Sequence, residues 1–237
     1  MTTPQLDRSL IAGLSVFAGM SETDLDAAIG LARPRRLPEG SAAFEQGQIA
    51  REFFVLLNGR LKVVQTTAAG QQVVVRHISP GEIFGVAKAM QRPDYPATAV
   101  AVVESLALAW SDTLWDAFVS RNTGFANAAM QTIGQRLQDA HGRILELTTE
   151  EAERRIARGV LRLVNQAGRK TELGVEVDFP VTREDIAEMT GTTLHTVSRT
   201  MTRWQEMGLV VSARKRITVT DPHRLFLLAE GRGAASD

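Results

Sequence analysis

The feature that most constrains this chain of 237 residues is an apolar seam just past its middle. Apolar residues recur there at alternating spacings of four and three, the a/d pattern of a heptad helix: Ala126, Met130, Ile133, Leu137, Ala140, Ile144 and Leu147. Such a narrow stripe favours a partner helix, and packing of one amphipathic helix on its own sheet is the alternative. The pattern predicts a long helix over residues 123–150 that dimerises through Met130, Ile133, Leu137, Ala140, Ile144 and Leu147.

Strand-like sequence precedes the seam. Short apolar or alternating runs are separated by glycines and occupy residues 53–57, 61–64, 73–75, 83–85 and 97–110. Strands with turn signals at this spacing are typical of an antiparallel sandwich or barrel. Ahead of them, Ser21 to Asp24 has the form of a capping box, which predicts a short helix that Pro34 ends.

A different pattern follows the seam. Charged residues 150–155 mark a boundary, and the order after it is helix, strand, helix, turn, helix and hairpin. Residues 168–174 are predicted as a loop, and the alternation of Val175, Val177, Phe179 and Val181 predicts a strand. We therefore expect three parts: a strand-rich domain over 1–122, the long dimerisation helix over 123–150 and a domain of mixed helices and strands over 151–237.

Residues 182–205 have the pattern of a helix-turn-helix. Thr182 to Asp185 forms a capping box, Gly191 breaks the first helix, and Thr192 or Thr193 caps the second. On the second helix Val197, Met201 and Trp204 step by four and three, which predicts its buried face. Leu194 lies at the edge of that face, so it belongs either to the core or to a contact with a thymine methyl group.

The opposite face of the second helix carries hydrogen-bonding groups. His195, Ser198, Arg199 and Thr202 fall there, and the hairpin that follows has the basic tip 214–216. Hydroxyls at a helix N-terminus bind phosphates, and an arginine can contact a guanine through two hydrogen bonds. We predict that DNA is bound by Thr192, Thr193, His195, Thr196, Ser198, Arg199, Thr202, Arg203, Arg214, Lys215 and Arg216.

The net charge of the chain is zero, but its local charge is not. Residues 191–216 carry five arginines and lysines and one glutamate, which gives a local charge of +4. Phosphate binding depends on the local field, so the neutral total does not argue against a nucleic-acid partner. The chain has no cysteine, which excludes disulfides and cysteine-held iron–sulfur clusters.

Four stretches carry a resemblance to a known family: FEQGQIAREFFVLLNGRLKVV, SPGEIFG, GQRLQ and VTREDIAEMTGTTLHTVSRTMTRWQEMGLV. With the order of parts, they resemble the cyclic AMP receptor protein / fumarate-nitrate reduction regulator (CRP/FNR) family. The resemblance implies an α+β protein with an antiparallel β-roll of the cyclic-nucleotide-binding type, a long dimerisation helix and a C-terminal winged helix-turn-helix. It also implies a homodimer on a palindromic DNA site, with an effector signal relayed from the roll through the long helices.

The resemblance places His195, Ser198 and Arg199 where the family contacts bases. The fumarate-nitrate type has a glutamate at the place of His195, so the outer base preference is expected to differ. Ser198 and Arg199 match, which implies a half-site resembling TTG, repeated roughly 34 Å apart by dimer symmetry. RNA polymerase is implied as a partner if the protein activates transcription.

The resemblance also bears on the effector. Cyclic-nucleotide sensors of this family carry a glutamate where this chain has Val86, and an arginine–serine pair where it has Pro96 and Ala97. They carry a pair of hydroxyl residues where it has Ala140 and His141. A buried phosphate without its arginine loses a charge-assisted bidentate bond, and the sequence offers no evident replacement. We therefore expect that cyclic AMP is not the effector. Regulation by a cyclic nucleotide or another small ligand is the alternative.

A further likeness is to regulators of the Dnr/NnrR type, through the element P-x-Y-x-A-T-A at residues 93–99. That likeness implies nitric oxide sensed through haem. Neutral imidazole is a suitable axial ligand for haem iron, which makes His77 and His141 the candidates. The predicted effector pocket consists of Phe84, Gly85, Val86, Met90, Pro96, Ala97, Ala140 and His141.

Other function classes have less support in the sequence. The four histidines lie in four separate contexts without a nucleophile, Walker or metal-spacing motif, so we expect no enzyme. A ligand-binding module whose helix-turn-helix contacts only proteins is the remaining alternative. No apolar run approaches the roughly 18 residues of a membrane span, and the N-terminus lacks a basic and an apolar region, so we expect a cytoplasmic protein.

Overall fold

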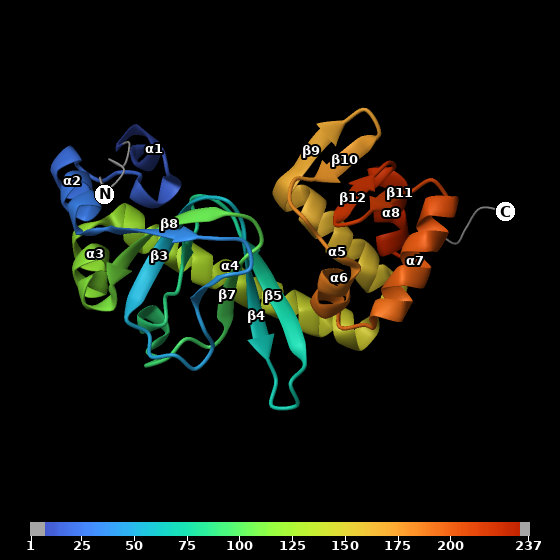
Figure 1. The fold of residues 1–237 in the computed structure, drawn as a ribbon, viewed down its shortest axis with the longest axis horizontal. Coiled ribbons are helices and arrows are strands. Elements are labelled where there is room, and N and C mark those ends of the chain that lie inside the picture. Colours follow the sequence, from blue (N-terminus) through green and yellow to red (C-terminus); the bar gives the residue numbers. More distant parts are fainter. Residues whose placement is uncertain (1–7, 233–237) are drawn as a thin grey trace. The chain divides into compact units, whose positions relative to one another are not determined.

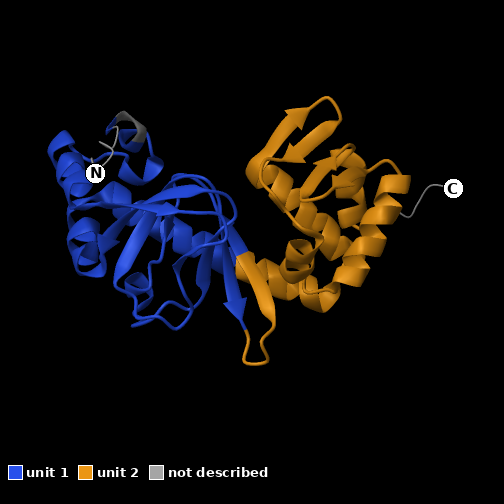
Figure 2. Ribbon diagram, viewed as in Figure 1, with its two compact units in different colours: residues 1–66, 76–138 blue, residues 67–75, 139–237 orange. Residues whose placement is uncertain are grey.

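The computed structural model describes residues 8–232 and contains two compact units. The first unit comprises residues 1–66 with 76–138, and the second comprises residues 67–75 with 139–237 (Figure 2). The division falls inside the long helix α4, Thr123–Thr149, because each end of that helix packs in a different unit. The three-part division expected from the sequence follows secondary structure instead and stays a prediction.

The first unit is built on antiparallel sheets, which confirms the predicted β-roll (Figure 1). Among the described residues, one four-stranded sheet has the order β1-β8-β3-β6 and the other β2-β7-β4-β5. The strands are β1 Arg33–Leu37, β2 Ala42–Phe44, β3 Glu52–Asn58, β4 Leu61–Thr66, β5 Gln72–Ile78, β6 Ile83–Phe84, β7 Thr98–Ala101 and β8 Ser105–Ser111.

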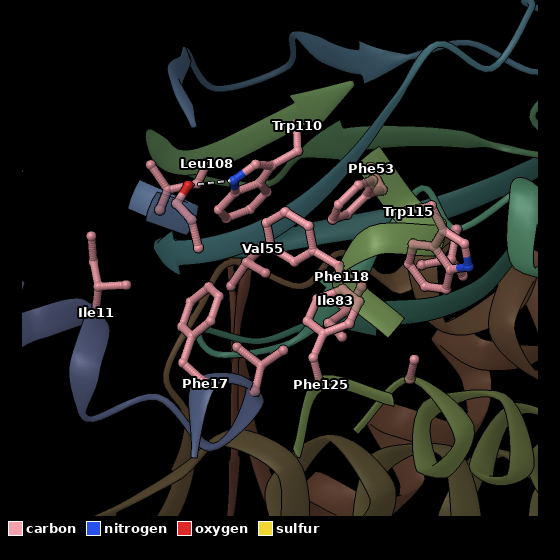
Figure 3. Close-up of a cluster of buried hydrophobic side chains, with 14 of the residues drawn as sticks. Ile11, Phe17, Phe53, Val55, Ile83, Leu108, Trp110, Trp115, Phe118 and Phe125 are labelled. Carbon is pink, nitrogen blue, oxygen red and sulfur yellow. Dashed lines mark hydrogen bonds between the residues drawn. The ribbon is translucent and has the colours of Figure 1, made fainter. Parts of the chain in front are cut away.

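One face of the β1-β8-β3-β6 sheet packs against helices. Phe53, Trp110, Phe118 and Phe125 converge there, with Phe53 and Trp110 stacked at 5.6 Å between ring centroids (Figure 3). The Trp110 indole donates to the Ala28 carbonyl oxygen over 2.7 Å, which satisfies its buried N–H. The covering helices are α1 Arg8–Ala12, α2 Glu22–Leu31, α3 Trp115–Arg121 and the start of α4, with short 3-10 turns at Ser15–Phe17, Lys88–Met90 and Asp112–Leu114.

The predicted first helix corresponds to α2. The Ser21 hydroxyl accepts a hydrogen bond from the Asp24 backbone N–H over 3.1 Å, which confirms Ser21 as its N-cap. The helix ends at Leu31, before Pro34, which lies inside the edge strand β1. Proline is tolerated at a sheet edge because it has no N–H to donate.

The other face of the same sheet forms the interior of the roll. Phe54, Ala107 and Ala109 face Phe44 and Phe84 there, and all five side chains are buried. The Phe54 and Phe84 rings stack at 5.0 Å. Successive side chains of a strand point to opposite faces of the sheet. Phe53 and Leu108 therefore enter the core on the helix side, and their neighbours Phe54 and Ala109 enter the interior of the roll.

The second unit combines helices with a small sheet of order β11-β12-β10-β9. Its helices are α5 Ala152–Ala167, α6 Arg183–Thr190, α7 Leu194–Glu206 and α8 Pro222–Ala229. Its strands are β9 Gly168–Thr171, β10 Gly174–Val177, β11 Val210–Ala213 and β12 Arg216–Val219. This is the winged helix-turn-helix that the resemblance implied.

Two predictions for the second unit are wrong. Residues 168–174, expected as a loop, contain the strand β9, which pairs with β10 although all four of its residues are exposed. The predicted strand ends early, at Val177, and Phe179 and Val181 are buried outside it. Pro180 lies between them and has no N–H for a ladder, so the sheet cannot continue while the apolar side chains still enter the core.

Candidate nucleic-acid interface

The turn between α6 and α7 is fixed by local hydrogen bonds. The Thr182 hydroxyl accepts from the Asp185 N–H over 3.0 Å, and the Asp185 carboxylate accepts from the Thr182 N–H over 2.9 Å. This confirms the predicted capping box. Gly191 ends α6 in the left-handed region at φ +60°, and a Cβ there would lie 2.7 Å from Leu147 Cδ2. The left-handed backbone favours glycine here, and the Leu147 side chain would have to shift to admit any larger residue.

Arg155 of α5 also holds this turn, a role that the sequence did not reveal. Its guanidinium donates to the Thr190 carbonyl oxygen over 3.0 Å and to the Gly191 carbonyl oxygen over 3.3 Å. It donates to the Glu150 carbonyl oxygen over 2.7 Å as well. The last carbonyls of a helix have no partner within the helix, so Arg155 satisfies those of α6 and joins them to the end of α4.

The inner face of α7 is buried as predicted. Val197, Met201 and Trp204 have no exposed surface, and the Trp204 indole donates to the Glu153 carboxylate over 2.8 Å. Leu194 is 50% exposed, so its assignment to the core is wrong. It is the first residue of the helix, where no other element covers it, and this leaves the thymine-methyl alternative open.

The outer face of α7 carries the predicted base-contacting residues. His195, Arg199 and Thr202 are exposed, and Ser198 is half-buried between them. Of the two candidate caps, the structure selects Thr193, whose hydroxyl accepts from the Thr196 N–H over 3.1 Å. The hydroxyls here therefore have a second role, because they stabilise the N-terminus of the helix that presents them.

Arg203 differs from the other predicted contacts. Its guanidinium forms an ion pair with Glu153, whose carboxylate also accepts from Trp204. Beside this pair lies a cleft of about 350 Å³ lined by residues of both helices, among them Glu151, Thr196 and Arg199. Glu153 thus holds the edge of the recognition helix against α5, a pairing across fifty positions of sequence that no local pattern signals.

The wing is a tight basic hairpin. Ser212 pairs with Ile217 and Ala213 with Arg216 across β11 and β12, which leaves Arg214 and Lys215 at the tip. Lys215 has φ +61°, and Arg214, Lys215 and Arg216 are all exposed. The Lys215 carbonyl oxygen accepts from the Val181 N–H over 3.1 Å, so the tip is attached to the segment that leads into α6. Three cations are presented together beside the helix-turn-helix.

The seam of α4 is largely exposed on the single chain. Met130 is 72%, Leu137 57% and Ile144 59% exposed, Ala140 is exposed, and Ile133 is half-buried. Leu147 is 54% exposed although its methyl groups reach Gly191. The helix therefore packs on its own units through other faces and leaves the apolar stripe uncovered.

The predicted effector residues are divided between the two units. Phe84, Val86 and Ala97 are buried, Gly85 and Pro96 are half-buried, and Met90 is 38% exposed. Phe84 belongs to the aromatic core of the roll. Ala140 and His141 are exposed and belong to the second unit, whereas His77 is buried on β5. Among the described residues, no group of three or more histidine, aspartate or glutamate side chains is placed to hold a metal ion.

Two arginines that the sequence pattern did not reveal lie near Phe84. Arg136 of α4 donates to the Ile83 carbonyl oxygen over 3.3 Å, and Arg76 of β5 pairs with Glu82 over 2.5 Å. Burial, and then the charge of Arg76, lower the pKa of the Arg136 guanidinium to about 10. Arg76 Nη2 and Arg136 Nε are buried without a hydrogen-bond partner. Two cations from distant positions therefore lie beside the strand that carries Phe84.

A second pair of half-buried arginines lies in the other unit. Arg143 donates to the Val74 carbonyl oxygen over 3.2 Å, and Arg162 of α5 pairs with Glu146 over 2.5 Å. Burial, and then the charge of Arg162, lower the pKa of Arg143. The long helix is thus bound to strand β5 and to α5 through charged side chains rather than through its seam.

Comparisons with known proteins agree with this architecture. Residues 34–122 match the family model described as a cyclic nucleotide-binding domain, and residues 154–227 match the Crp-like helix-turn-helix domain. Among solved structures, the fold is similar to that of a CooA mutant from Carboxydothermus hydrogenoformans, with a TM-score of 0.72 and 19% sequence identity. The match covers 86% of this chain and 90% of that chain. FixK2 from Bradyrhizobium japonicum gives a TM-score of 0.72 at 18% identity, covering 87% and 99%.

Sequence relatives extend over most of the chain. The cyclic AMP receptor protein of Thermus thermophilus is 29% identical over 200 residues, which cover 84% of this chain and 88% of the relative. The transcriptional activator protein FnrA of Stutzerimonas stutzeri is 25% identical over 222 residues, which cover 93% and 91%. No helix among residues 8–232 has both the length and the apolar composition needed to cross a membrane. With its β-roll, long helix and winged helix-turn-helix, the chain belongs to the CRP/FNR family of DNA-binding transcriptional regulators.

Proposed function

We propose that the protein regulates transcription as a homodimer that reads a palindromic site through α7. The observation that carries this proposal is the division of α7 into two faces. Val197, Met201 and Trp204 anchor one face without any exposed surface, so the other face presents His195 and Arg199 from a fixed position. A rigid helix with donors on its free face meets the requirement for reading base edges in the major groove.

Arg199 supplies sequence selection in this proposal. Arg199 lies in the middle of α7, is exposed and forms no ion pair among the described residues. Both donors of its fork are therefore available to O6 and N7 of one guanine. Ser198 and His195 contact the neighbouring positions, which gives a half-site resembling TTG. His195 sets the outer base preference.

The wing supplies affinity rather than selection. Arg214, Lys215 and Arg216 are exposed at or beside a hairpin tip and contact the phosphate backbone, whose charge is the same for every sequence. Arg203 is paired with Glu153, so it takes part in phosphate binding only after leaving that carboxylate.

Dimerisation follows from the exposed seam. Two copies of the stripe from Met130 to Ile144 cover each other's apolar surface, as a/d positions of paired helices do. The dimer places two recognition helices on half-sites about one DNA turn, roughly 34 Å, apart. RNA polymerase is a further partner if the regulator is an activator.

The experiment that tests DNA reading is selection from a random DNA library by the wild type and by Arg199→Ala. We expect the variant to lose its preference at one position of each half-site, by about 1–3 kcal/mol, and to keep the preferences at the others. Arg214→Ala is the matched control, because it should weaken all sequences equally. Unchanged selectivity in Arg199→Ala would refute the role of this residue. Binding that does not weaken with salt would favour a module that contacts only proteins.

The effector is proposed to differ from cyclic AMP. Val86, Pro96 and Ala97 lack the carboxylate, guanidinium and hydroxyl that hold a cyclic nucleotide in the family, although Arg76 and Arg136 provide positive charge nearby. The alternative, a regulator that responds to a cyclic nucleotide or another small ligand through these arginines, is tested by measuring DNA affinity with and without cyclic AMP. An increase with cyclic AMP that Arg136→Met abolishes would support the alternative.

Nitric oxide sensing through haem stays a prediction. His141 is exposed on α4, and Phe84 and Val86 are buried in the first unit. His77 is the better-placed ligand because it is buried. Reconstitution of the purified protein with haem tests the prediction, since a Soret band that shifts with nitric oxide and is lost in His77→Ala would support it.

A further inference from the structure

A group of charged and apolar side chains lies at one end of the β-roll interior, around a cavity whose lining includes neither Phe84 nor Arg136. In the ladder β1-β8-β3, Arg33 stands opposite Ala109, and Ala109 stands opposite Phe54. Side chains in such a row share a face of the sheet, so Arg33 and Arg35 project on the interior side with Phe54. Arg36 projects on the other side. The interior positions thus change from apolar to charged at the end of the roll.

A cavity of about 730 Å³ opens at this place, which we call the roll mouth. Its lining joins strands β1, β2 and β3 to the loop before β3 and to Tyr95. Small-molecule sites typically measure roughly 300–1,000 Å³ and occur in the mouths of β-barrels. The interior positions of β8 opposite Arg35 and Arg33 carry the small residues Ala107 and Ala109.

The lining includes both apolar and charged side chains. Leu31 and Ile49 are 53% and 62% exposed, and both line the cavity. Beneath them the Phe44 and Tyr95 rings stack at 3.9 Å between centroids. These groups provide an apolar surface that water covers poorly, which a hydrophobic ligand would bury.

The charged part has an excess of arginine. Arg33, Arg35 and Arg51 line the cavity with a single carboxylate, Glu52. Arg35 pairs with Glu52 over 2.8 Å, and neither Arg33 nor Arg51 forms an ion pair among residues 8–232. Two guanidiniums at one cavity favour an anion, and a planar fork is suited to a carboxylate.

The wall of the roll mouth is held in place by hydrogen bonds. The Tyr95 N–H donates to the Gln48 carbonyl oxygen over 3.0 Å, and the Gly47 N–H donates to the Tyr95 carbonyl oxygen over 2.8 Å. The Tyr95 hydroxyl donates to the Glu52 carbonyl oxygen over 2.7 Å, and burial raises the pKa of this phenol, so it stays neutral. Little ordering of the chain is needed for a ligand to bind such a wall.

We infer that the roll mouth binds an amphipathic carboxylate, a small molecule with one anionic head and an apolar body. Arg33 and Arg51 hold the carboxylate, and the body lies against Ile49 and Leu31. Inward charges on an edge strand also protect it from pairing with another sheet, and this would account for Arg33. Protection of an edge strand does not account for Arg51, which lies in a loop, or for the exposed apolar side chains of Leu31 and Ile49. The inference goes beyond DNA binding and does not depend on it.

Calorimetric titration of the full chain with octanoate tests the inference. We expect saturable binding of one octanoate per chain, and much weaker binding of 1-octanol and octylammonium, which share the apolar body but lack the anionic head. Arg33→Gln and Arg51→Gln should each lower octanoate affinity about tenfold, the loss of one charge-assisted contact. Arg36→Gln is the matched control, since it removes the same charge from the opposite face of β1 and should bind octanoate like the wild type.

The outcomes separate this site from the proposed function. Equal affinity for octanoate and 1-octanol, no saturable binding of octanoate, or unchanged binding by both Arg33→Gln and Arg51→Gln would overturn the inference. Equal losses in Arg36→Gln would also overturn it, because they would indicate a nonspecific charge effect. Circular dichroism melting shows whether each variant is folded. Without octanoate, Arg33→Gln should bind DNA like the wild type, so failure at the roll mouth is distinguishable from failure of DNA reading.

Discussion

The helices α4 and α7 both have a one-sided apolar pattern, but the structure treats their apolar faces in opposite ways. Val197, Met201 and Trp204 of α7 have no exposed surface within their own unit, whereas Met130 and Ile144 of α4 are 72% and 59% exposed. Periodicity therefore reveals that a face is apolar but not what covers it. The width of the stripe distinguishes the two cases, because a narrow a/d seam matches a second helix better than a globular core.

The largest expected effect is the loss of the core anchor of α7. Trp204→Ala removes a fully buried ring and its bond to Glu153, so we expect the free energy of unfolding of the second unit to fall by about 3–5 kcal/mol. Chemical denaturation followed by circular dichroism measures it. Thr202→Ala, on the exposed face of the same helix, is the control and should change the value by less than about 0.5 kcal/mol. Similar values for the two variants would show that the faces of α7 do not differ in burial.

The next effect concerns the seam of α4. Ile144→Asp places a charge in the proposed helix interface and should give a folded monomer, because Ile144 contributes little to the packing of a single chain. Losing the linkage between two DNA-binding domains should lower DNA affinity on the order of 100-fold. Light scattering gives the mass, and a DNA-binding titration gives the affinity.

Gln138→Asp is the control for the seam, since residue 138 is exposed on α4 outside the a/d positions. It should leave both the mass and the affinity of the wild type. A dimer of unchanged mass in Ile144→Asp, or a wild type that is monomeric at working concentration, would contradict dimerisation through this stripe. The contrast between α4 and α7 would then need another cause, such as packing of the stripe by a different protein.

The sequence predicted the elements whose causes are local. The Thr182–Asp185 capping box and the buried stripe of α7 depend on spacings of three and four residues within one helix, and both are found in the structure. Leu194 fits the same stripe but is exposed, because coverage at the first turn of a helix depends on neighbouring elements that periodicity does not describe. The exposed strand β9 lacks an apolar alternation altogether, since it is stabilised by pairing with β10 rather than by burial.

Charged partners distant in sequence could not be predicted in the same way. Arg76 and Arg136 are sixty positions apart, and only the fold places their charges together. Glu153 looked like part of a solvated charged segment, yet it binds both Trp204 and Arg203. Each of these contacts joins side chains from different elements, and spacing rules within one element carry no information about such pairs.

The smallest expected effect tests whether Glu153 restrains the recognition helix. Glu153→Gln keeps an oxygen for the Trp204 indole but removes the charge that holds Arg203, so stability should fall by no more than about 1 kcal/mol, as for other partly exposed ion pairs. The released Arg203 is then free to reach a phosphate. The slope of log affinity against log salt should therefore become steeper by about 0.9, which titrations at several salt concentrations measure.

A double-mutant cycle decides whether the steeper salt slope of Glu153→Gln arises from Arg203. In the Glu153→Gln background, Arg203→Ala should return the salt slope to that of the wild type. In the wild-type background, Arg203→Ala should change the salt slope little, because Glu153 already neutralises that guanidinium. Equal effects of Arg203→Ala in both backgrounds would mean that Arg203 binds DNA regardless of Glu153. Dependence on Glu153 would instead extend the contrast with α4. Charges as well as an apolar face would then hold α7 in its own unit, whereas the seam of α4 is exposed on the single chain.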